Sequence, residues 1–218
     1  MPANPPKTAD QPTRRALIEA AVHLFGRKGF DGASTREIAA RAGANVAAIA
    51  YHFGGKEGLR LACLDAIGEQ FGEIVAVDGP LPPGTPADAR RRLERILRAG
   101  VRFMVMPGPA EDFAAFLMRE IVFDGPLIGE IYARLFAPQH SRLCALWAAA
   151  TGGDAGSADT RLAVFAMIGQ ILYFRIGQPI ILRRMDWSEI TAAEADAIAD
   201  ILVRNLHAAL TAAERSPP

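Results

Sequence analysis

The sequence predicts an all-α fold. Apolar residues recur at spacings of three and four along most of the 218-residue chain, as they do on one face of an α-helix. Half of the residues are apolar and 22% are charged, which is enough apolar material for one large core or two small ones and excludes a disordered chain. No segment shows the strict alternation of apolar and polar residues that is typical of a half-buried strand.

The N-terminal segment predicts a short lead-in followed by a helix. Residues 1–12 are rich in proline and polar residues and lack the apolar stretch of a signal peptide, so we interpret them as a disordered lead-in. From residue 13 the apolar residues follow helical spacing, and Gly29 ends the pattern. We therefore expect the first helix over 13–29.

Two short helices joined by a tight turn are expected next. Ser34 and Glu37 have the spacing of a capping box, which predicts the start of a helix. Gly43 ends that helix at a position that favours a left-handed backbone, and Asn45 can cap a third helix that runs to about Phe53. In a helix-turn-helix of this kind, the second short helix can enter the major groove of DNA.

The rest of the chain predicts further helices. A fourth helix is expected from residue 56 through 71, before the proline-rich segment 78–86 breaks the chain. Helical spacing recurs after this segment over five ranges, which are 87–106, 110–123, 126–151, 157–185 and 192–213. Pro138 is expected to kink the third of these helices.

The distribution of charge supports a division into two domains, over 13–60 and 61–218. The whole chain has 24 basic and 24 acidic side chains, so bulk charge does not favour nucleic acid. Residues 1–60 carry nine Lys or Arg against five Asp or Glu, a net of +4, and the remaining fifteen against nineteen give −4. DNA binding is therefore expected to be local to the first domain.

Cysteine usage and hydropathy indicate a soluble cytoplasmic protein. Cys63 and Cys144 lie 81 positions apart and lack the spacing of a metal site or a disulfide framework, so we expect no metal and no cofactor. The apolar stretch 162–182 has spanning length, but Arg175 within it would be costly in a bilayer. We interpret this stretch as a buried helix and expect no membrane partner.

Two other classes of function remain open. His140 and Cys144 lie four residues apart on an expected helix and could provide the base and nucleophile of a small helical enzyme. No sequence motif of a known catalytic class accompanies them, and we assign no catalytic residues. A helical interaction module that does not bind DNA is the other alternative, and the segregation of charge counts against it.

The segment 14–60 resembles the TetR family of bacterial repressors. The matching residues are Ala20-Ala21, Leu24-Phe25, Gly29-Phe30, Ser34-Thr35, Ile38-Ala39, Ala42-Gly43, Ile49, Tyr51-His52-Phe53-Gly54 and Lys56-Glu57-Gly58-Leu59. Segments 45–59 and 168–179 are also similar to the CecR-type subgroup. The resemblance implies a transcriptional regulator that a small-molecule effector releases from a palindromic DNA operator. It also implies a homodimer that forms through the last two long helices.

The resemblance implies two sets of contacts with double-stranded DNA. Phosphate contacts would come from helix ends that carry hydroxyl and cationic groups, namely Thr35, Tyr51, His52 and Lys56. Base contacts would come from the exposed side of the third helix, namely Asn45, Val46, Ala47 and Ala50. Because most of these four side chains are small and apolar, we expect contact with thymine methyl groups, with part of the specificity arising from DNA shape.

The resemblance also implies an effector pocket in the larger domain. Aromatic and soft apolar side chains with a few polar anchors are typical of such a pocket, and the candidates are Phe103, Phe116, Arg119, Phe136, Trp147, Gln170, Phe174 and Arg175. Arg175 requires a partner because its surroundings are so apolar. That partner could be a carboxylate of the same chain, the other subunit or an anionic ligand.

Overall fold

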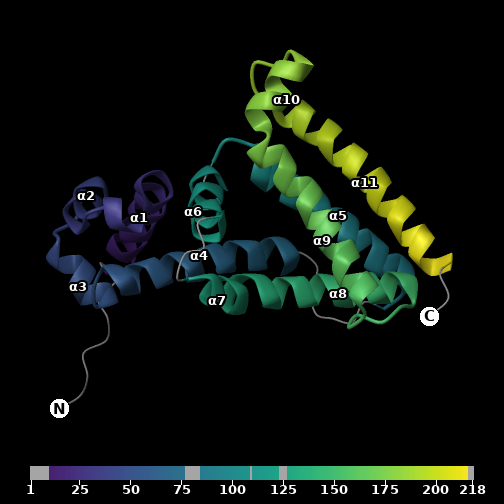
Figure 1. Ribbon diagram of the computed structural model, residues 1–218, viewed down its shortest axis with the longest axis horizontal. Coiled ribbons are helices and arrows are strands. Elements are labelled where there is room, and N and C mark those ends of the chain that lie inside the picture. The colour runs from purple at the N-terminus through teal and green to yellow at the C-terminus, as the bar shows by residue number, and fades with distance from the viewer. Residues whose placement is uncertain (1–9, 77–83, 109, 123–126, 216–218) are drawn as a thin grey trace. The chain divides into compact units, whose positions relative to one another are not determined.

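The computed structural model describes residues 10–76, 84–108, 110–122 and 127–215, and it is helical throughout (Figure 1). These ranges contain no strand, which confirms the predicted all-α fold. The helices are α1 (Asp10–Gly32), α2 (Thr35–Arg41), α3 (Ala47–Phe53), α4 (Lys56–Ala76), α5 (Pro86–Val105), α6 (Ala110–Val122), α7 (Ile128–Glu130), the π-helix η1 (Ile131–Phe136), α8 (Ala137–Thr151), α9 (Ala158–Ile176), α10 (Gln178–Met185) and α11 (Ala192–Arg215).

The helices divide into two compact units. The first unit combines the chain up to Gly68 with Asp112–Arg134, and the second combines Glu69–Glu111 with the chain from Leu135 onward. Helices α4 and α6 therefore contribute residues to both units. The expected domain boundary after residue 60 falls inside the continuous helix α4, and most of α6 joins the N-terminal unit instead of the later one.

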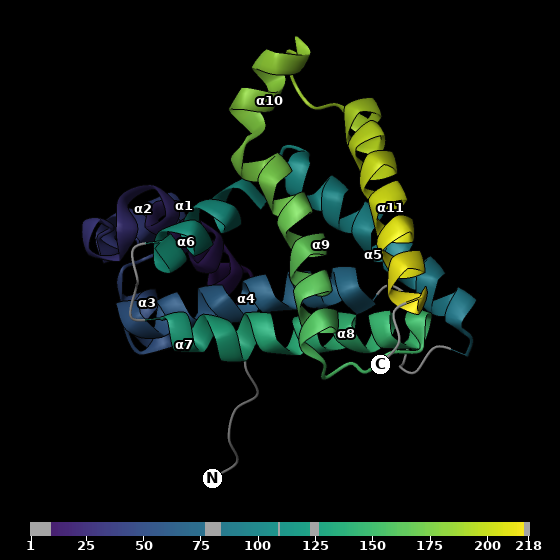
Figure 2. The same ribbon diagram turned by 45° about the vertical axis from the view of Figure 1, so that its right-hand side comes forward.

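The first unit is built on the apolar faces of α1, α2, α3, α4 and α6. Helix α2 lies beside α1 in both ribbon views (Figures 1 and 2). The large side chains that are fully buried in this unit are Leu17, Phe25, Ile38, Ile49, Leu59, Leu64, Ile67 and Phe116. Burial of each such side chain contributes about 1.5–3 kcal/mol to stability, so this core holds the short helices α2 and α3 in place.

Local hydrogen bonds set the turn between α2 and α3, as the sequence predicts. Ser34 Oγ accepts a hydrogen bond from Glu37 N at 3.2 Å, and the Glu37 carboxylate accepts one from Ser34 N at 3.0 Å, which confirms the capping box. Gly43 has a φ of +64°, which confirms the predicted left-handed turn. Asn45 Oδ1 accepts a hydrogen bond from Ala47 N at 2.9 Å and so begins α3.

Helix α1 is longer than predicted. It begins at Asp10, three residues before the expected start, and continues to Gly32. Gly29 has a φ of +77° and interrupts the helical backbone at the position where the sequence predicts the end of the first helix. Residues 1–9 of the expected lead-in lie outside the described residues.

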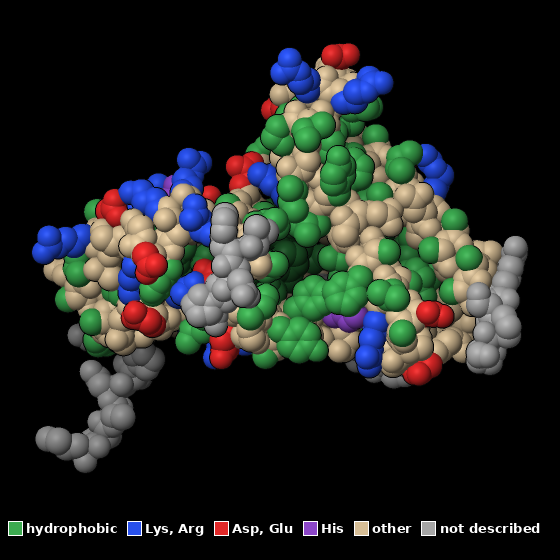
Figure 3. All heavy atoms as spheres, in the orientation of Figure 1, with side chains coloured by type: hydrophobic (Ala, Val, Ile, Leu, Met, Phe, Trp, Pro, Cys, Tyr) green, Lys and Arg blue, Asp and Glu red, His purple; other side chains and the backbone are tan. Residues whose placement is uncertain are grey.

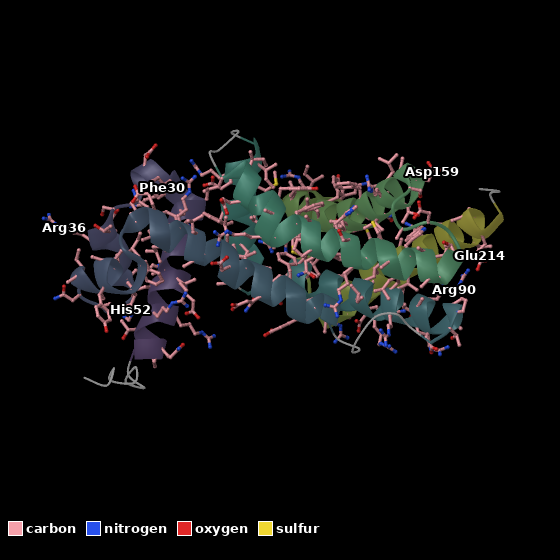
Figure 4. All side chains as sticks on the ribbon, turned by 90° about the horizontal axis from the view of Figure 1, so that it is seen from below. Phe30, Arg36, His52, Arg90, Asp159 and Glu214 are labelled. Atoms are coloured by element: carbon pink, nitrogen blue, oxygen red, sulfur yellow. The ribbon has the colours of Figure 1, made fainter. Side chains whose placement is uncertain are left out.

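The second unit is built on α5, α8, α9 and α11. Its core includes Leu93, Val101, Leu146, Trp147 and Leu202. Ion pairs flank this core between α5 and α11, and they join Arg98 to Asp200, Arg102 to Asp196 and Arg90 to Glu214. The last pair is labelled in Figure 4. Because partly exposed ion pairs contribute little to stability, the apolar core provides most of the packing energy.

The predicted helix over 157–185 is wrong in one respect, because it is two helices. Helices α9 and α10 meet at Gly177 with a bend of 72°. Pro179 explains the break, since it has no N–H to continue the helix and its ring clashes with the carbonyl of Arg175. Pro138 lies in the first turn of α8, directly after the π-helix η1.

The apolar stretch 162–182 is buried on one side only, which also differs from the prediction. Helix α9 exposes a row of large apolar side chains along one face, and α10 adds Ile180. We call this row the α9 stripe, and it consists of Leu162, Phe165, Tyr173 and Ile176. Figure 3 shows hydrophobic side chains on the surface of α9 and α10. Within the described ranges no single helix is long and apolar enough to cross a membrane, although the bent pair α9 and α10 together meets that criterion.

Candidate nucleic-acid interface

Helix α3 presents most of its length to solvent. The four predicted base-reading residues, Asn45, Val46, Ala47 and Ala50, are all exposed. Ile49 is buried and anchors the other side of the helix in the core of the first unit. The four predicted base-reading side chains are therefore accessible from solvent. Asn45 uses its side-chain oxygen to cap α3, so its amide nitrogen is the group that can donate to a base or phosphate.

The end of α3 carries two of the predicted phosphate contacts. Tyr51 is 74% exposed, so it is not packed between α1 and α4. Its ring meets the ring of His52 edge-on, with centroids 4.9 Å apart. His52 is half-buried and also contacts Phe53. Both residues thus lie in the last turn of α3, where Figure 4 labels His52.

The other two predicted phosphate contacts begin helices. Thr35 is the first residue of α2 and Lys56 the first residue of α4. The Lys56 ammonium lies 4.3 Å from the centroid of the Phe30 ring. Gly54, at φ +73°, and Gly55, at φ +141°, turn the chain between α3 and α4, and these angles favour glycine. This turn brings Lys56 within three residues of the end of α3.

A close contact fixes the angle between α3 and α4. A Cβ atom added to Gly58 would lie only 1.9 Å from the carbonyl oxygen of Phe53. Only glycine therefore fits in the first turn of α4 without a backbone shift. Sequence reasoning used Gly58 as part of a family pattern and did not identify this role, because the contact depends on how the two helices meet.

Charge is distributed unevenly over the helix-turn-helix. Lys28 donates a hydrogen bond to Glu37 at 2.6 Å. This bond, together with hydrogen bonds from Ser34, lowers the pKa of Glu37 to about 2. Arg36 and Arg41 are exposed, and Arg36 points away from the ribbon in Figure 4. Basic side chains, with some acidic ones among them, are visible over this part of the surface in Figure 3.

Two family models match the chain. The model described as "Bacterial regulatory proteins, tetR family" matches residues 17–63, which include α2 and α3. The model described as "HTH-type transcriptional dual regulator CecR, C-terminal domain" matches residues 89–213, more than half of the chain. The chain belongs to the TetR family of transcriptional regulators. The likeness of residues 45–59 and 168–179 to the CecR-type subgroup agrees with the second match.

Similar proteins support this assignment over nearly the full length. The HTH-type transcriptional dual regulator CecR of Shigella flexneri is 38% identical over 192 residues, which cover 85% of both chains. The crystal structure of a TetR-like transcriptional regulator from Rhodococcus sp. RHA1 matches with a TM-score of 0.68 at 22% identity, over 95% of this chain and 99% of that one. AibR in complex with isovaleryl coenzyme A and operator DNA has a TM-score of 0.59 at 20% identity, over 88% and 96% of the chains.

Most of the predicted pocket residues lie in the second unit of this TetR-family chain. Phe103 meets Phe71 edge-on, with centroids 5.6 Å apart, and Trp147 is buried in the core. Phe174 packs against that core beside Tyr173. Arg175 lies 3.4 Å from the Glu111 carboxylate and also contacts the carbonyl of Met104. A carboxylate of the same chain is therefore the partner that Arg175 requires.

Two predicted pocket residues lie in the first unit instead. Phe116 is buried against Phe25, with ring centroids 6.2 Å apart. The Arg119 guanidinium lies against Gly29. These two residues therefore belong to a different unit from Phe103, Trp147, Phe174 and Arg175, and Phe116 packs α6 onto α1. Helical spacing could not distinguish the two environments, since both are apolar.

A cavity of about 80 Å³ lies between α9 and α11 in the second unit. Its lining includes two of the predicted pocket residues, Trp147 and Gln170. Gln170 Oε1 accepts a hydrogen bond from Asn205 Nδ2 at 2.8 Å, which joins α9 to α11. Pockets for drug-sized ligands measure about 300–1,000 Å³, so this cavity in its present form accommodates a side chain or a few water molecules.

The remaining predicted pocket residue, Phe136, contacts His140, which with Cys144 forms the pair considered above as the base and nucleophile of an enzyme. Phe136 stacks on His140 and on Phe165, with centroids 5.4 and 5.3 Å apart. His140 Nδ1 lies 3.5 Å from Cys144 Sγ, but burial raises the pKa of Cys144 and so disfavours the nucleophilic thiolate. The described residues contain no cluster of three His, Cys, Asp or Glu side chains that could hold a metal. Family membership makes the chain a regulator and leaves this pair a packing role.

Proposed function

We propose that this chain is a cytoplasmic repressor that binds a palindromic operator as a homodimer and leaves it when a small molecule binds. One observation carries the proposal: a short helix, α3, exposes its outer face, with Tyr51 in its last turn and Lys56 at the start of the next helix, α4. A helix of this kind fits the major groove, while groups at the flanking helix ends meet the phosphates on either side.

The phosphate contacts in this proposal are Thr35, Tyr51, His52 and Lys56. The Tyr51 hydroxyl and the Lys56 ammonium can donate hydrogen bonds to phosphate oxygens. Exposure of Tyr51 and the position of Lys56 at the start of α4 support these roles. Such contacts bind any DNA sequence and give affinity that falls steeply with salt.

Sequence preference in this proposal comes from Asn45, Val46, Ala47 and Ala50. The Val46 side chain and the two alanine methyl groups are exposed and can contact thymine methyl groups. Asn45 is the one hydrogen-bonding side chain of the four. Because direct readout is so limited, we expect the operator's shape and flexibility to add to its recognition.

Dimerisation through α9 and α11 is supported by the apolar surface that these helices expose. The α9 stripe and Ile201 of α11 are exposed, and the hydrogen bond between Gln170 and Asn205 joins the two helices that carry them. Large exposed apolar patches are typical of interfaces, and a two-fold dimer presents two copies of α3 to two operator half-sites.

Release by a small molecule is proposed to act on the second unit. The candidate lining residues there are Phe103, Phe136, Trp147, Gln170, Phe174 and Arg175. Helix α4 begins at Lys56 and continues into that unit, so a shift of α4 would move a phosphate contact. A ligand that favours the shifted state weakens operator binding by its differential affinity, typically about 1–3 kcal/mol. AibR, solved with isovaleryl coenzyme A and operator DNA, supports the proposal of both kinds of ligand.

The proposal is tested by retardation of DNA from upstream of the chain's own gene. Binding should fall steeply as ionic strength rises. The double variant Tyr51→Ala/Lys56→Gln should weaken binding to every sequence, whereas Val46→Thr should change which sequence is preferred. Tyr132→Ala/Arg184→Ala, which removes an exposed tyrosine and an exposed cation elsewhere, is the matched control. Unchanged binding by the Tyr51/Lys56 variant would contradict the phosphate assignments.

A further inference from the structure

We infer that Phe30 and Glu120 position Lys56 for its phosphate contact, although neither side chain is placed against DNA. The ring of Phe30, which we call the Phe30 platform, contacts the Lys56 ammonium. Glu120 neutralises Arg60, which contacts the same ring. The inference rests on the proposed phosphate contact of Lys56. It assigns part of the operator affinity to a glutamate in α6, outside the helix-turn-helix.

Two cations lie over the ring of Phe30. The Lys56 ammonium and the Arg60 guanidinium carbon are each 4.3 Å from its centroid. Lys56 and Arg60 are four residues apart, so they project from neighbouring turns of the same face of α4. Phe30 is itself held against Phe25, with ring centroids 5.5 Å apart. Aromatic faces attract cations at these distances, so the ring limits where the flexible lysine side chain can place its charge.

Two positive charges on one ring repel each other unless one of them is compensated. Glu120 compensates Arg60: Arg60 Nε lies 3.2 Å and Nη2 2.5 Å from the Glu120 carboxylate. Arg60 is 8% exposed and Glu120 5% exposed, so water screens this pair weakly. The bidentate geometry fixes the guanidinium plane. Among the described residues no ion pair with a carboxylate is seen for Lys56, the other cation on the ring.

The carboxylate of Glu120 is itself held in place by the packing of α6 on α1. A Cβ added to Gly26 would lie 3.1 Å from both the Cβ of Ala115 and the backbone nitrogen of Phe116. His23 Nδ1 lies 2.9 Å from the Asp112 carboxylate at the other end of this contact. Helix α6 is thus docked closely, and its position determines where Glu120 meets Arg60.

Loss of the Phe30 ring or of the Glu120 charge should leave the Lys56 side chain less constrained. Without the Phe30 ring, the Lys56 side chain samples more rotamers and loses that freedom again when it binds a phosphate. Without the charge of Glu120, the Arg60 guanidinium is a buried unpaired cation that must move toward another partner or water. Operator affinity falls in both cases while the DNA-facing residues are unchanged.

A double-mutant cycle on Phe30 and Lys56 tests the platform. Phe30→Leu keeps an apolar side chain but removes the ring, and Phe30→Tyr keeps the ring. We expect Phe30→Leu to weaken operator binding by roughly three- to tenfold and Phe30→Tyr to leave it nearly unchanged. In a Lys56→Gln background, Phe30→Leu should have little further effect on operator binding, because the phosphate-contacting cation that the ring holds is gone and only Arg60 remains on it.

The salt dependence of binding tests the role of Glu120. Glu120→Gln should lower the slope of log affinity against log salt concentration by about one per subunit, as expected for loss of one phosphate contact. Glu19→Gln, which removes an exposed carboxylate on α1 that pairs with Arg15, is the matched control and should leave the slope unchanged. Circular dichroism identifies any variant that has not folded. If Glu120→Gln is such a variant, the double-mutant cycle on Phe30 and Lys56 tests the inference without it.

The possible failures are distinguishable. If Lys56→Gln binds the operator as tightly as the unaltered chain, the phosphate contact itself is wrong and the inference fails with it. If Lys56→Gln weakens binding but Phe30→Leu has the same effect in both backgrounds, the contact stands and the platform is wrong. If Glu120→Gln lowers affinity at an unchanged salt slope, Glu120 acts on stability and not on the lysine.

Discussion

Glu37 shows how a single exposed side chain contributes to presentation of the DNA-facing helix. It closes the capping box at the start of α2 and pairs with Lys28 of α1. These contacts tie α2 to the end of α1, and α2 in turn leads to α3 through the turn at Gly43. Charge and hydrogen bonding therefore add to the buried apolar core in setting this corner of the first unit.

The depressed pKa of Glu37 predicts a pH-dependent contribution to stability. The Lys28 contact and the Ser34 hydrogen bonds lower the pKa to about 2 from an ordinary value of 4.5. The carboxylate thus stabilises the folded state fully above pH 4.5, and this contribution is lost as the pH falls towards 2. Glu37→Gln should lower the melting temperature at pH 7, and the difference from the unaltered chain should shrink between pH 4.5 and 2. A difference that is independent of pH would contradict the assignment.

Sequence patterns at this scale predicted the capping box, the left-handed Gly43 and the exposed face of α3, because each depends on residues close together in the chain. The Phe30 platform and the partner of Arg175 could not be predicted in the same way. They depend on Arg60 meeting Glu120, 60 positions later, and on Arg175 meeting Glu111, 64 positions earlier. Spacing along one helix contains no information about such distant pairs.

At the scale of elements, the junction between α3 and α4 determines the direction of the reading helix. Three glycines serve this junction. Gly54 and Gly55 adopt backbone angles that favour glycine, and Gly58 allows α4 to approach the carbonyl of Phe53. The geometry of this junction therefore depends on glycine, which has no side chain, at these three positions.

Gly58→Ala should destabilise the first unit and weaken operator binding. Alanine is favoured over glycine inside a helix by about 1 kcal/mol, so a stability loss would show that the clash with Phe53 exceeds this gain. We expect a net loss of about 1–3 kcal/mol, measured by chemical denaturation. Gly129→Ala is the control, because a Cβ there meets no atom within 4 Å. Equal or greater stability of Gly58→Ala would contradict the close contact.

The bend between α9 and α10 and the docking of α6 mark where element prediction from sequence failed. Apolar spacing continues through Gly177, so periodicity alone indicated one helix, although Pro179 was the local signal for a break. The assignment of α6 to the first unit has no local signal, because it follows from the fit of Gly26 against the α6 backbone.

At the scale of the whole molecule, the exposed α9 stripe is the surface on which the proposed homodimer depends. Leu162, Phe165, Tyr173 and Ile176 are large apolar residues on one helix face, and water contact with such a face is unfavourable. A second copy can cover it in a two-fold arrangement, in which each stripe residue is used twice.

Charge substitutions in the stripe should separate the proposed dimer. Burial of one large apolar side chain contributes about 1.5–3 kcal/mol, and two-fold symmetry doubles this, so Leu162→Glu or Ile176→Glu should raise the dimer dissociation constant by about 10²- to 10⁴-fold. Light scattering should show monomers at concentrations where the unaltered chain is dimeric. Ile128→Glu, an exposed isoleucine on α7, should remain dimeric. A dimer of unchanged affinity in the stripe variants would place the interface elsewhere.

Selection of bound fragments from genomic DNA, followed by footprinting of the selected site, tests the central claim most directly. A dimeric regulator that inserts α3 into the major groove should enrich one two-fold symmetric sequence. Its protected half-sites should lie about one helical turn, roughly 34–36 Å, or a multiple of this apart. Enrichment of no sequence, or a footprint without symmetry, would contradict the account.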